Sequence, residues 1–311
     1  MPSTAAVTTV LAAPADHLDE ALTTGAVVPM WKQRLRIFLH NKLAIASVAY
    51  LVIITLLCFL VPIFHPTNQT NQAATFGLHW NSPPSAQHWL GLDSNGYDVL
   101  GRIFYGGEYS LTLGFLAGFI TIVVGTLYGM VSGFIAGYTD TVMMRLLDAF
   151  LSIPYIFLLL SLITIFGRST VFLICVIGFT GWWGNARIIR GDALLIRNLE
   201  YSQAATAMGG RRMHIIRRHV FPNSISNIVT VATFSVADAI LFLSALGFLG
   251  LGIQAPQTDW GTMLQAGATQ IQNGFWWEIF PLAGVFILVV VAINYIGDAL
   301  RDAFEVRLIE R

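Results

Sequence analysis

Residues 109–139 read YSLTLGFLAGFITIVVGTLYGMVSGFIAGYT, thirty-one residues without one charged side chain. A helix rises about 1.5 Å per residue and the hydrocarbon core of a bilayer is about 30 Å thick, so a run of this length crosses a membrane. Four more uncharged stretches have 18 to 22 residues, and a run of 39 residues, 220–258, is interrupted only by Asp238. That run holds one span and a loop, because glycines and a proline break it after residue 246. The pattern predicts six spans, at about 43–64, 110–137, 145–166, 169–186, 224–250 and 279–297.

The composition agrees with a membrane protein. Hydrophobic residues make up 55% of the chain and charged residues 11%, less than half the charged share of an average soluble protein. This excludes a disordered chain and disfavours an ordinary cytosolic enzyme. Both cysteines, Cys58 and Cys175, lie in apolar runs, which indicates packing and no disulfide framework. The fold class expected is an all-α integral membrane protein.

The basic residues predict the orientation of the chain. Four precede the first span, one separates the second and third, seven lie between the fourth and fifth, and three follow the sixth, whereas the other side holds only Arg102 and Arg168. Lys and Arg concentrate on the cytoplasmic side of membrane proteins. We therefore expect both termini and a loop at 187–222 in the cytoplasm, and the loop 65–108 outside.

The ends of the chain carry weaker signals. Residues 1–30 are rich in Ala and Thr and have no basic start of the kind a secretory signal needs, which indicates a disordered cytoplasmic tail, with a second short tail at 306–311. Residues 31–42, WKQRLRIFLHNK, alternate basic and bulky apolar side chains. This segment either lies along the membrane surface as an amphipathic helix or merely fixes topology by its charge.

Several chemistries are absent from the sequence. The only lysines are Lys32 and Lys42 and neither follows a glycine, so the chain holds no P-loop for ATP. It has no HExxH zinc motif and no GxSxG serine elbow. His65, His79 and His88 share the outer loop without regular spacing, and we expect surface histidines and no metal site. The formal net charge of zero gives no pull toward nucleic acid.

The loop 187–222 is patterned beyond what topology needs. Asn198 is expected to cap a helix that has Glu200 in its first turn, and Gly209-Gly210 to end it. The small alanines of this helix permit close approach to another surface. A second helical stretch, 211–220, carries four arginines, and Pro222 is expected where the fifth span begins.

Four segments in order resemble one family. The run Gln203-Ala204-Ala205, then Gly209 and Phe221-Pro222, resembles the "EAA" loop of permease subunits of bacterial ABC importers. The segments HWLGLDSNGYDVLGRIFYGGEYSL (88–111), RLLDAFLSIP (145–154) and FLGLGIQAPQTDWGTML (248–264) resemble the C-type permease of dipeptide, oligopeptide and nickel importers. The resemblance covers about residues 35–305, in a permease domain expected over 43–305. The sequence departs from the family at three places. Gln203 replaces the glutamate of the loop, Tyr97 stands where an arginine is common, and Leu243 lies near the position of a common glutamate. These differences mean that individual salt bridges of the family do not transfer to this chain, but they leave the family assignment intact.

The resemblance implies a fold, partners and a mechanism. The fold is that of the type I ABC importer permease, in the bacterial inner membrane. The partners are a second homologous permease, two cytoplasmic ATP-binding subunits that hold ATP and Mg, an external binding protein and a peptide. This chain itself binds no cofactor and catalyses no reaction. The residues implied for ATPase coupling are Glu200, Gln203, Ala204, Ala205, Gly209, Arg211, Arg212 and Pro222.

Two features inside the membrane leave alternatives open. The second span carries glycines near one helical face, which pack either within the subunit or against a second permease: Gly114, Gly118, Gly125, Gly129, Gly133 and Gly137. Asp238 lies deep in the fifth span, where a carboxylate is costly. It either lines the translocation path and meets a peptide's amino group or hydrogen-bonds another helix. Asp148 is expected to pair locally with Arg145.

The sequence thus predicts a non-catalytic permease subunit of an ATP-driven peptide importer. Nickel or another small solute is the alternative substrate. An ATP-independent channel or secondary carrier is the alternative class, disfavoured because polar residues are scarce within the spans and no internal repeat is visible.

Overall fold

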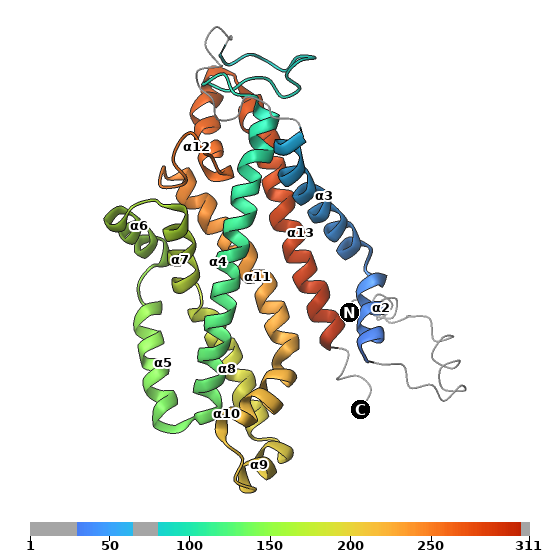
Figure 1. The fold of residues 1–311 in the computed structure, drawn as a ribbon, viewed down its shortest axis with the longest axis vertical. Helices are drawn as coiled ribbons and strands as arrows, with labels where there is room; N and C mark the ends of the chain where they lie inside the picture. The colour runs from blue at the N-terminus through green and yellow to red at the C-terminus, as the bar shows by residue number, and fades with distance from the viewer. Residues whose placement is uncertain (1–29, 65–79, 306–311) are drawn as a thin grey trace, which may run out of the picture.

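The computed structural model describes residues 30–64 and 80–305, and in these ranges the chain is mostly helical, with one isolated β-bridge between Leu92 and Asp98. The tails expected before residue 30 and over 306–311, together with residues 65–79 of the expected outer loop, lie outside the described residues. The helices form an elongated bundle with residues 80–98 at one end and α9, Glu200–Ala207, at the other (Figure 1).

The first three helices differ in length, and the third is the longest. They are α2, Met30–His40; α3, Lys42–Phe64; and α4, Val99–Ile135. Helix α2 packs against α3 and against the last helix, α13, Phe280–Glu305, and the Arg34 guanidinium lies 4.5 Å from the centre of the Phe304 ring. The segment 31–42 is therefore helical up to His40, with a break at Asn41, and part of it is tied to the last helix.

A set of short-range contacts fixes where α4 begins. Asp98 caps the helix, because its side chain accepts a hydrogen bond from the Gly101 N–H at 2.8 Å, and its second oxygen lies 2.8 Å from His88 Nδ1. Asp93 accepts from the N–H groups of Asn95 and Tyr97 at 2.8 and 2.9 Å. This capped helix then passes through the centre of the bundle, in contact with α3, α7, α8 and α11.

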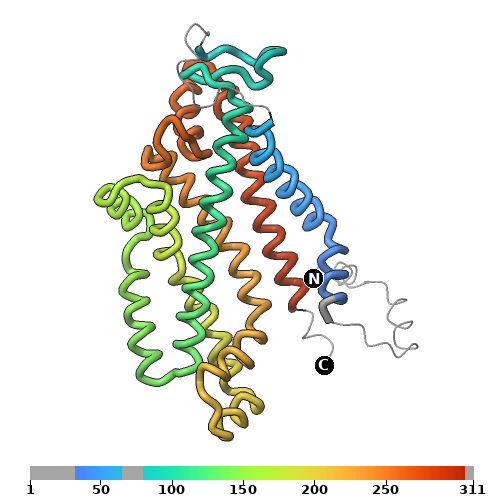
Figure 2. The backbone as a smooth tube through the Cα atoms, viewed as in Figure 1, coloured from blue at the N-terminus to red at the C-terminus, as the bar shows by residue number. Residues whose placement is uncertain are grey.

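The next four helices do not form two simple spans. They are α5, Gly137–Leu151; α6, Tyr155–Phe166; α7, Thr170–Thr180; and α8, Trp183–Arg197. Helix α5 and helix α6 meet at 78°, because Pro154 has no N–H to continue a helix and disfavours helical geometry in the residue before it. The segment predicted as one span over 145–166 is thus broken at 152–154. Figure 2 shows α5 to α7 stopping short of the end where residues 80–98 lie.

The chain then turns at α9, Glu200–Ala207, and returns through α10, Arg212–Ile215, a π-helical turn, Ile216–Val220, and α11, Phe221–Phe248. A π turn widens the helix just before Pro222, which relieves the missing N–H and the bulk of the proline ring. Beyond α11 come the short α12, Trp260–Gln270, 3-10 turns at Ile271–Asn273 and Trp276–Glu278, and α13, Phe280–Glu305.

Five helical segments of the described chain are long and apolar enough to cross a membrane, and the bent pair α5 and α6 makes six if it counts as one span. The run 220–258 holds one such helix followed by a loop, since α11 ends at Phe248. The segment predicted over 169–186 is interrupted by a turn at 181–182, and its second helix, α8, continues to Arg197. One buried cluster joins α3, α4, α11 and α13 toward residues 80–98, and another joins α4, α8, the π turn and α11 near α9.

Candidate functional site

The loop 187–222 is helical over most of its length and projects from one end of the bundle (Figure 1). The prediction that Asn198 caps the next helix is wrong. Leu199 occupies the cap position of α9 without a side-chain hydrogen bond, and the Asn198 carbonyl instead accepts from Gln203 Nε2 at 3.2 Å. Asn198 does not cap α9 because it is the C-cap residue of α8, with a helical φ of −86° and ψ of −2°.

Helix α9 has one buried and one exposed face. Ser202 is buried and Ala205 packs against the apolar cluster of α8 and α11, whereas Glu200, Gln203 and Ala204 are exposed. The helix ends at the glycine pair, as the sequence predicted: Gly209 has a φ of +81°, and the Gly210 N–H donates to the Ala205 carbonyl at 3.1 Å.

Apolar side chains surround α9 on the outside of the molecule. Met208 is 83% exposed, Leu195 70% and Met213 57%, and Leu199 and Tyr201 are exposed as well. Contiguous exposed apolar surface next to charged groups is typical of a protein interface. This surface lies at the tip of the bundle, away from the long apolar helices, so a water-exposed partner can reach it.

Four arginines lie beside this surface. Arg211, Arg212, Arg217 and Arg218 are exposed, and none of their side chains forms an ion pair or hydrogen bond with another described residue. Pro222 is exposed in the first turn of α11. The residues predicted for ATPase coupling therefore lie on or beside one short helix and its exit, from Glu200 to Pro222.

Polar contacts connect α8 to its neighbours. Arg190 makes a bidentate ion pair with Asp140 of α5, with Nε–Oδ1 and Nη2–Oδ2 distances of 2.6 and 2.7 Å. The Ser132 hydroxyl of α4 donates a hydrogen bond to the same carboxylate. Asn227 of α11 donates to Asp192 of α8 at 2.8 Å. Helix α8 is thus held to α4, α5 and α11 close to the point where it passes into α9.

The expected pair of Asp148 with Arg145 is wrong. Asp148 pairs with Arg187 of α8, with an Nη2–Oδ1 distance of 2.5 Å. Both side chains are about half exposed. Spacing along one helix favoured Arg145, but the packing of α5 on α8 brings a residue 39 positions away into reach.

The glycines of α4 contact two helices of the same chain. A Cβ added at Gly118 would lie 2.9 Å from the Val236 Cα of α11, and one at Gly133 would lie 2.8 Å from the Ala193 Cβ of α8. Gly114 faces Ile240 of α11, and Gly125 and Gly129 face α8. Gly137 does not share this face: it begins α5 with a φ of +65°, and a Cβ there would meet nothing within 4 Å.

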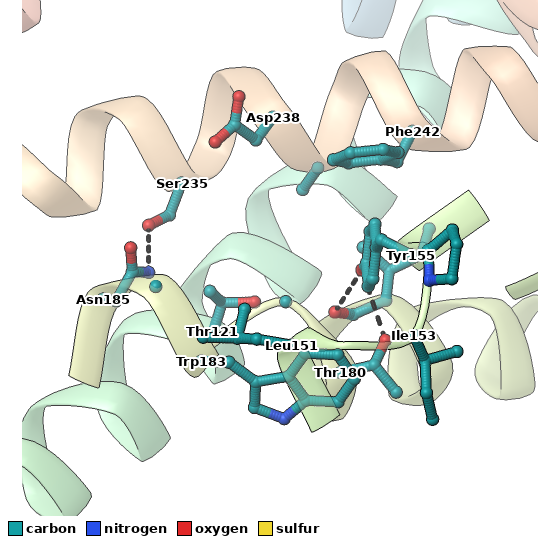
Figure 3. A pocket seen from close by; sticks show the side chains of 15 residues that line it. Thr121, Leu151, Ile153, Tyr155, Thr180, Trp183, Asn185, Ser235, Asp238 and Phe242 are labelled. Carbon is teal, nitrogen blue, oxygen red and sulfur yellow. Dashed lines mark hydrogen bonds between the residues drawn. The ribbon is translucent and has the colours of Figure 1, made fainter. Parts of the chain in front are cut away.

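A cavity of about 340 Å³ lies where four parts of the chain converge (Figure 3). Its wall combines α4, the break between α5 and α6, the break between α7 and α8, and α11. Asp238 on α11 lines it and is exposed, and no described residue forms a hydrogen bond or ion pair with its carboxylate. The hydrogen bond to another helix that was one expectation for Asp238 is therefore not formed within the described chain.

The loop formed by residues 80–98, at the other end of the bundle, is held in place by side-chain contacts. Trp277 Nε1 donates to the Leu92 carbonyl at 3.3 Å, which ties this loop to the start of the last long helix. Burial raises the pKa of Asp93, against the lowering effect of Arg102. Three tryptophans, Trp80, Trp89 and Trp276, are exposed.

The described residues hold no group of three His, Cys, Asp or Glu side chains suited to a metal ion. His88 lies against Asp98 at the start of α4, while His65 and His79 lie outside the described residues.

Residues 108–310 match the family described as the binding-protein-dependent transport system inner membrane component, and residues 29–84 match the N-terminal TM domain of oligopeptide transport permease C. The chain belongs to this family of transport permeases. The permease is 38% identical to the dipeptide transport system permease protein DppC of Bacillus subtilis over 86% of its own length and 83% of the relative's. It is 37% identical to the oligopeptide transport system permease protein OppC of Haemophilus influenzae, over 94% and 92% of the two chains.

A solved structure supports the fold of the permease independently. An inward-facing MetNI methionine ABC transporter matches with a TM-score of 0.52 at 20% identity, over 65% of this chain and 96% of that one. The predicted family and the predicted type I permease fold are thus confirmed. The permease is a multi-pass inner-membrane protein.

Proposed function

We propose that this permease forms half of the translocation path of an ATP-driven peptide importer and is driven by a separate ATPase through α9. Relatives that match nearly its whole length are permeases of dipeptide and oligopeptide transport systems. The observation that carries the coupling role is the exposed surface of α9, with its small side chains, surrounding apolar groups and unpaired arginines.

The partners follow from this role. A second homologous permease supplies the other half of the path, two cytoplasmic subunits hold ATP and Mg, and an external binding protein delivers the peptide. This chain has no lysine after a glycine, so ATP hydrolysis belongs to other subunits. Both termini and α9 are assigned to the cytoplasm, because 15 of the 17 basic residues lie on that side of the proposed topology.

Helix α8 is the proposed route from the ATPase to the path. An ATPase that binds α9 differently with and without ATP shifts the equilibrium between two arrangements of the bundle. Helix α9 follows α8 directly, Arg190 of α8 holds Asp140 of α5, and Trp183 and Asn185 of α8 line the cavity. A displacement of α9 is thereby passed to the helices around the cavity, which opens on alternate sides of the membrane.

The test is reconstitution of the complex that copurifies with this chain. Proteoliposomes that contain the complex should accumulate a labelled tripeptide only when ATP and the binding protein are both present. Omission of the ATPase subunits is the control, and uptake that persists without them would show a channel or secondary carrier. Accumulation of nickel in place of peptide would contradict the peptide assignment.

A further inference from the structure

The cavity beside Asp238 has the composition of a site for an organic cation. Its lining includes one charged side chain, Asp238, and no Lys, Arg or His. Three aromatic side chains, Tyr155, Trp183 and Phe242, form part of the wall, and the Tyr155 and Phe242 rings meet edge to face with centres 4.5 Å apart. Aromatic ring faces attract ammonium groups, and the carboxylate adds a full negative charge.

A second acceptor lies on the same wall. Ser235 Oγ donates its single hydrogen to the Val231 carbonyl at 2.7 Å, so it can only accept from Asn185, whose Nδ2 lies 2.7 Å away. This arrangement fixes the Asn185 amide and leaves its Oδ1 without a hydrogen bond to another described residue. Figure 3 shows this pair beside Asp238, with Ser235, Asp238 and Phe242 along α11.

The spacing along α11 explains why these groups meet. Residues three and seven positions apart share one face of a helix, and Ser235, Asp238 and Phe242 have that spacing. The breaks at 152–154 and 181–182 bring Tyr155 and Trp183 opposite this face. A primary ammonium has three donors, and this wall offers it a carboxylate, an amide oxygen and ring faces.

A metal ion fits this wall less well. Protein sites for transition metals combine several His, Cys or carboxylate ligands, and Asp238 is the single side chain of those types here. Building on the proposed transport function, we infer that this cavity is a subsite that binds the N-terminal ammonium of a peptide during its passage, with Asp238 as the counter-charge.

The structure offers a direct probe of occupancy. Gly184 lines the cavity, and a Cβ added there would meet nothing within 4 Å, so a cysteine fits. In the purified complex, with Cys58 and Cys175 replaced by serine, the Gly184→Cys thiol is labelled with N-ethylmaleimide in the presence of increasing trialanine or N-acetyl-trialanine. No binding protein is added, so its own selectivity does not enter.

Trialanine is expected to protect the thiol at a concentration about tenfold lower than N-acetyl-trialanine, the size of one charge-assisted hydrogen bond. Asp238→Asn should remove this difference, and Asp238→Glu should largely keep it. Asp298→Asn is the matched control, because Asp298 is an exposed carboxylate of α13, which contributes nothing to this cavity.

Equal protection by the two peptides, absence of protection, or a difference that survives Asp238→Asn would each overturn the inference. If Asp238→Asn weakened protection by both peptides equally, that result would also overturn the inference, because it would indicate a structural role for Asp238. ATP-driven peptide uptake by the wild-type complex is measured in parallel. Uptake without protection defeats the subsite alone, whereas absence of uptake defeats the proposed function.

Discussion

Two ion pairs between α5 and α8 differ in their surroundings. The Asp140 and Arg190 side chains are 12% and 29% exposed, and the carboxylate also accepts a hydrogen bond from Ser132. Asp148 and Arg187 are about half exposed, where a pair contributes about 0–1 kcal/mol. Removal of one partner from a buried pair leaves an uncompensated charge and destabilises far more. The Asp140 pair is therefore the stronger of the two ion pairs between α5 and α8.

The glycines of α4 provide a matched test of packing. A Cβ at Gly129 would press on the Ala186 carbonyl and lie 3.0 Å from the Arg190 N, whereas one at Gly191 of α8 would meet nothing within 4 Å. We expect Gly129→Ala to destabilise the permease by about 1–3 kcal/mol, the cost of overpacking a tight contact. Gly191→Ala should stabilise it by up to about 1 kcal/mol, since alanine favours helix.

The measurement is the midpoint of thermal unfolding of each purified variant in one detergent. Gly129→Leu, with a larger side chain, should prevent assembly of the complex. A midpoint for Gly129→Ala equal to that of the wild type would contradict the tight contact of α4 with α8. Normal assembly and transport by Gly129→Leu would contradict it at the level of function.

Among the elements, α9 owes its C-terminal end to the backbone conformation of one glycine, Gly209. Gly209 adopts a left-handed φ of +81°, and a Cβ there meets nothing within 4 Å. Only glycine, and to a lesser extent asparagine, adopts this geometry at low cost. A side chain at this position would project from the end of α9 toward whatever binds the surface.

We expect Gly209→Trp to abolish peptide uptake while ATP binding by the partner subunits is unchanged, because both the turn and the docking surface are altered. Gly209→Asn is the control that keeps the turn with a small side chain, and it should retain most of the uptake. Nucleotide binding and uptake are measured on the same complexes. Wild-type uptake with Gly209→Trp would rule out coupling through this end of α9.

Some elements were predictable because signals in the local sequence decide them. Helix α9 was found because local signals decide it: a first-turn glutamate, small residues and a glycine pair. The break at 152–154 was missed because counting residues between charges ignores Pro154, although proline after Ser152-Ile153 was the available signal. The bend changes the direction of α6 and places the residues of the break in the wall of the cavity. A count of apolar residues cannot predict this.

For the molecule as a whole, the membrane class and the family could be predicted from sequence, whereas the convergence of distant residues could not. Asp148 and Arg187 are 39 positions apart, and Asn185 and Ser235 are 50 apart. The first pair meets because α5 packs on α8. The second meets because α8 and α11 both pack against α4, a contact that the glycines of α4 permit but do not specify. Asp238 was noticed for its depth in an apolar run, and its aromatic surroundings came only with the fold.

The two ends of the bundle also suggest different partners. Helix α9 and its arginines lie at one end, and Trp80, Trp89 and Trp276 are exposed toward the other, on or near the loop that contains residues 80–98 (Figure 1). Trp89 is 73% exposed. Tryptophan is enriched among residues that dominate binding energy at protein interfaces. In the proposed topology this end is outside, where the binding protein delivers the peptide.

We expect Trp89→Ala to raise the KM for peptide-loaded binding protein by about tenfold, with the maximal uptake rate little changed, because a truncated interface anchor weakens docking and leaves the path intact. Phe157→Ala is the matched control, since Phe157 of α6 is 63% exposed but lies away from this loop. Uptake is measured in proteoliposomes against the concentration of loaded binding protein. An unchanged KM for Trp89→Ala, or an equal rise for both variants, would contradict the role of Trp89 as an anchor for the binding protein.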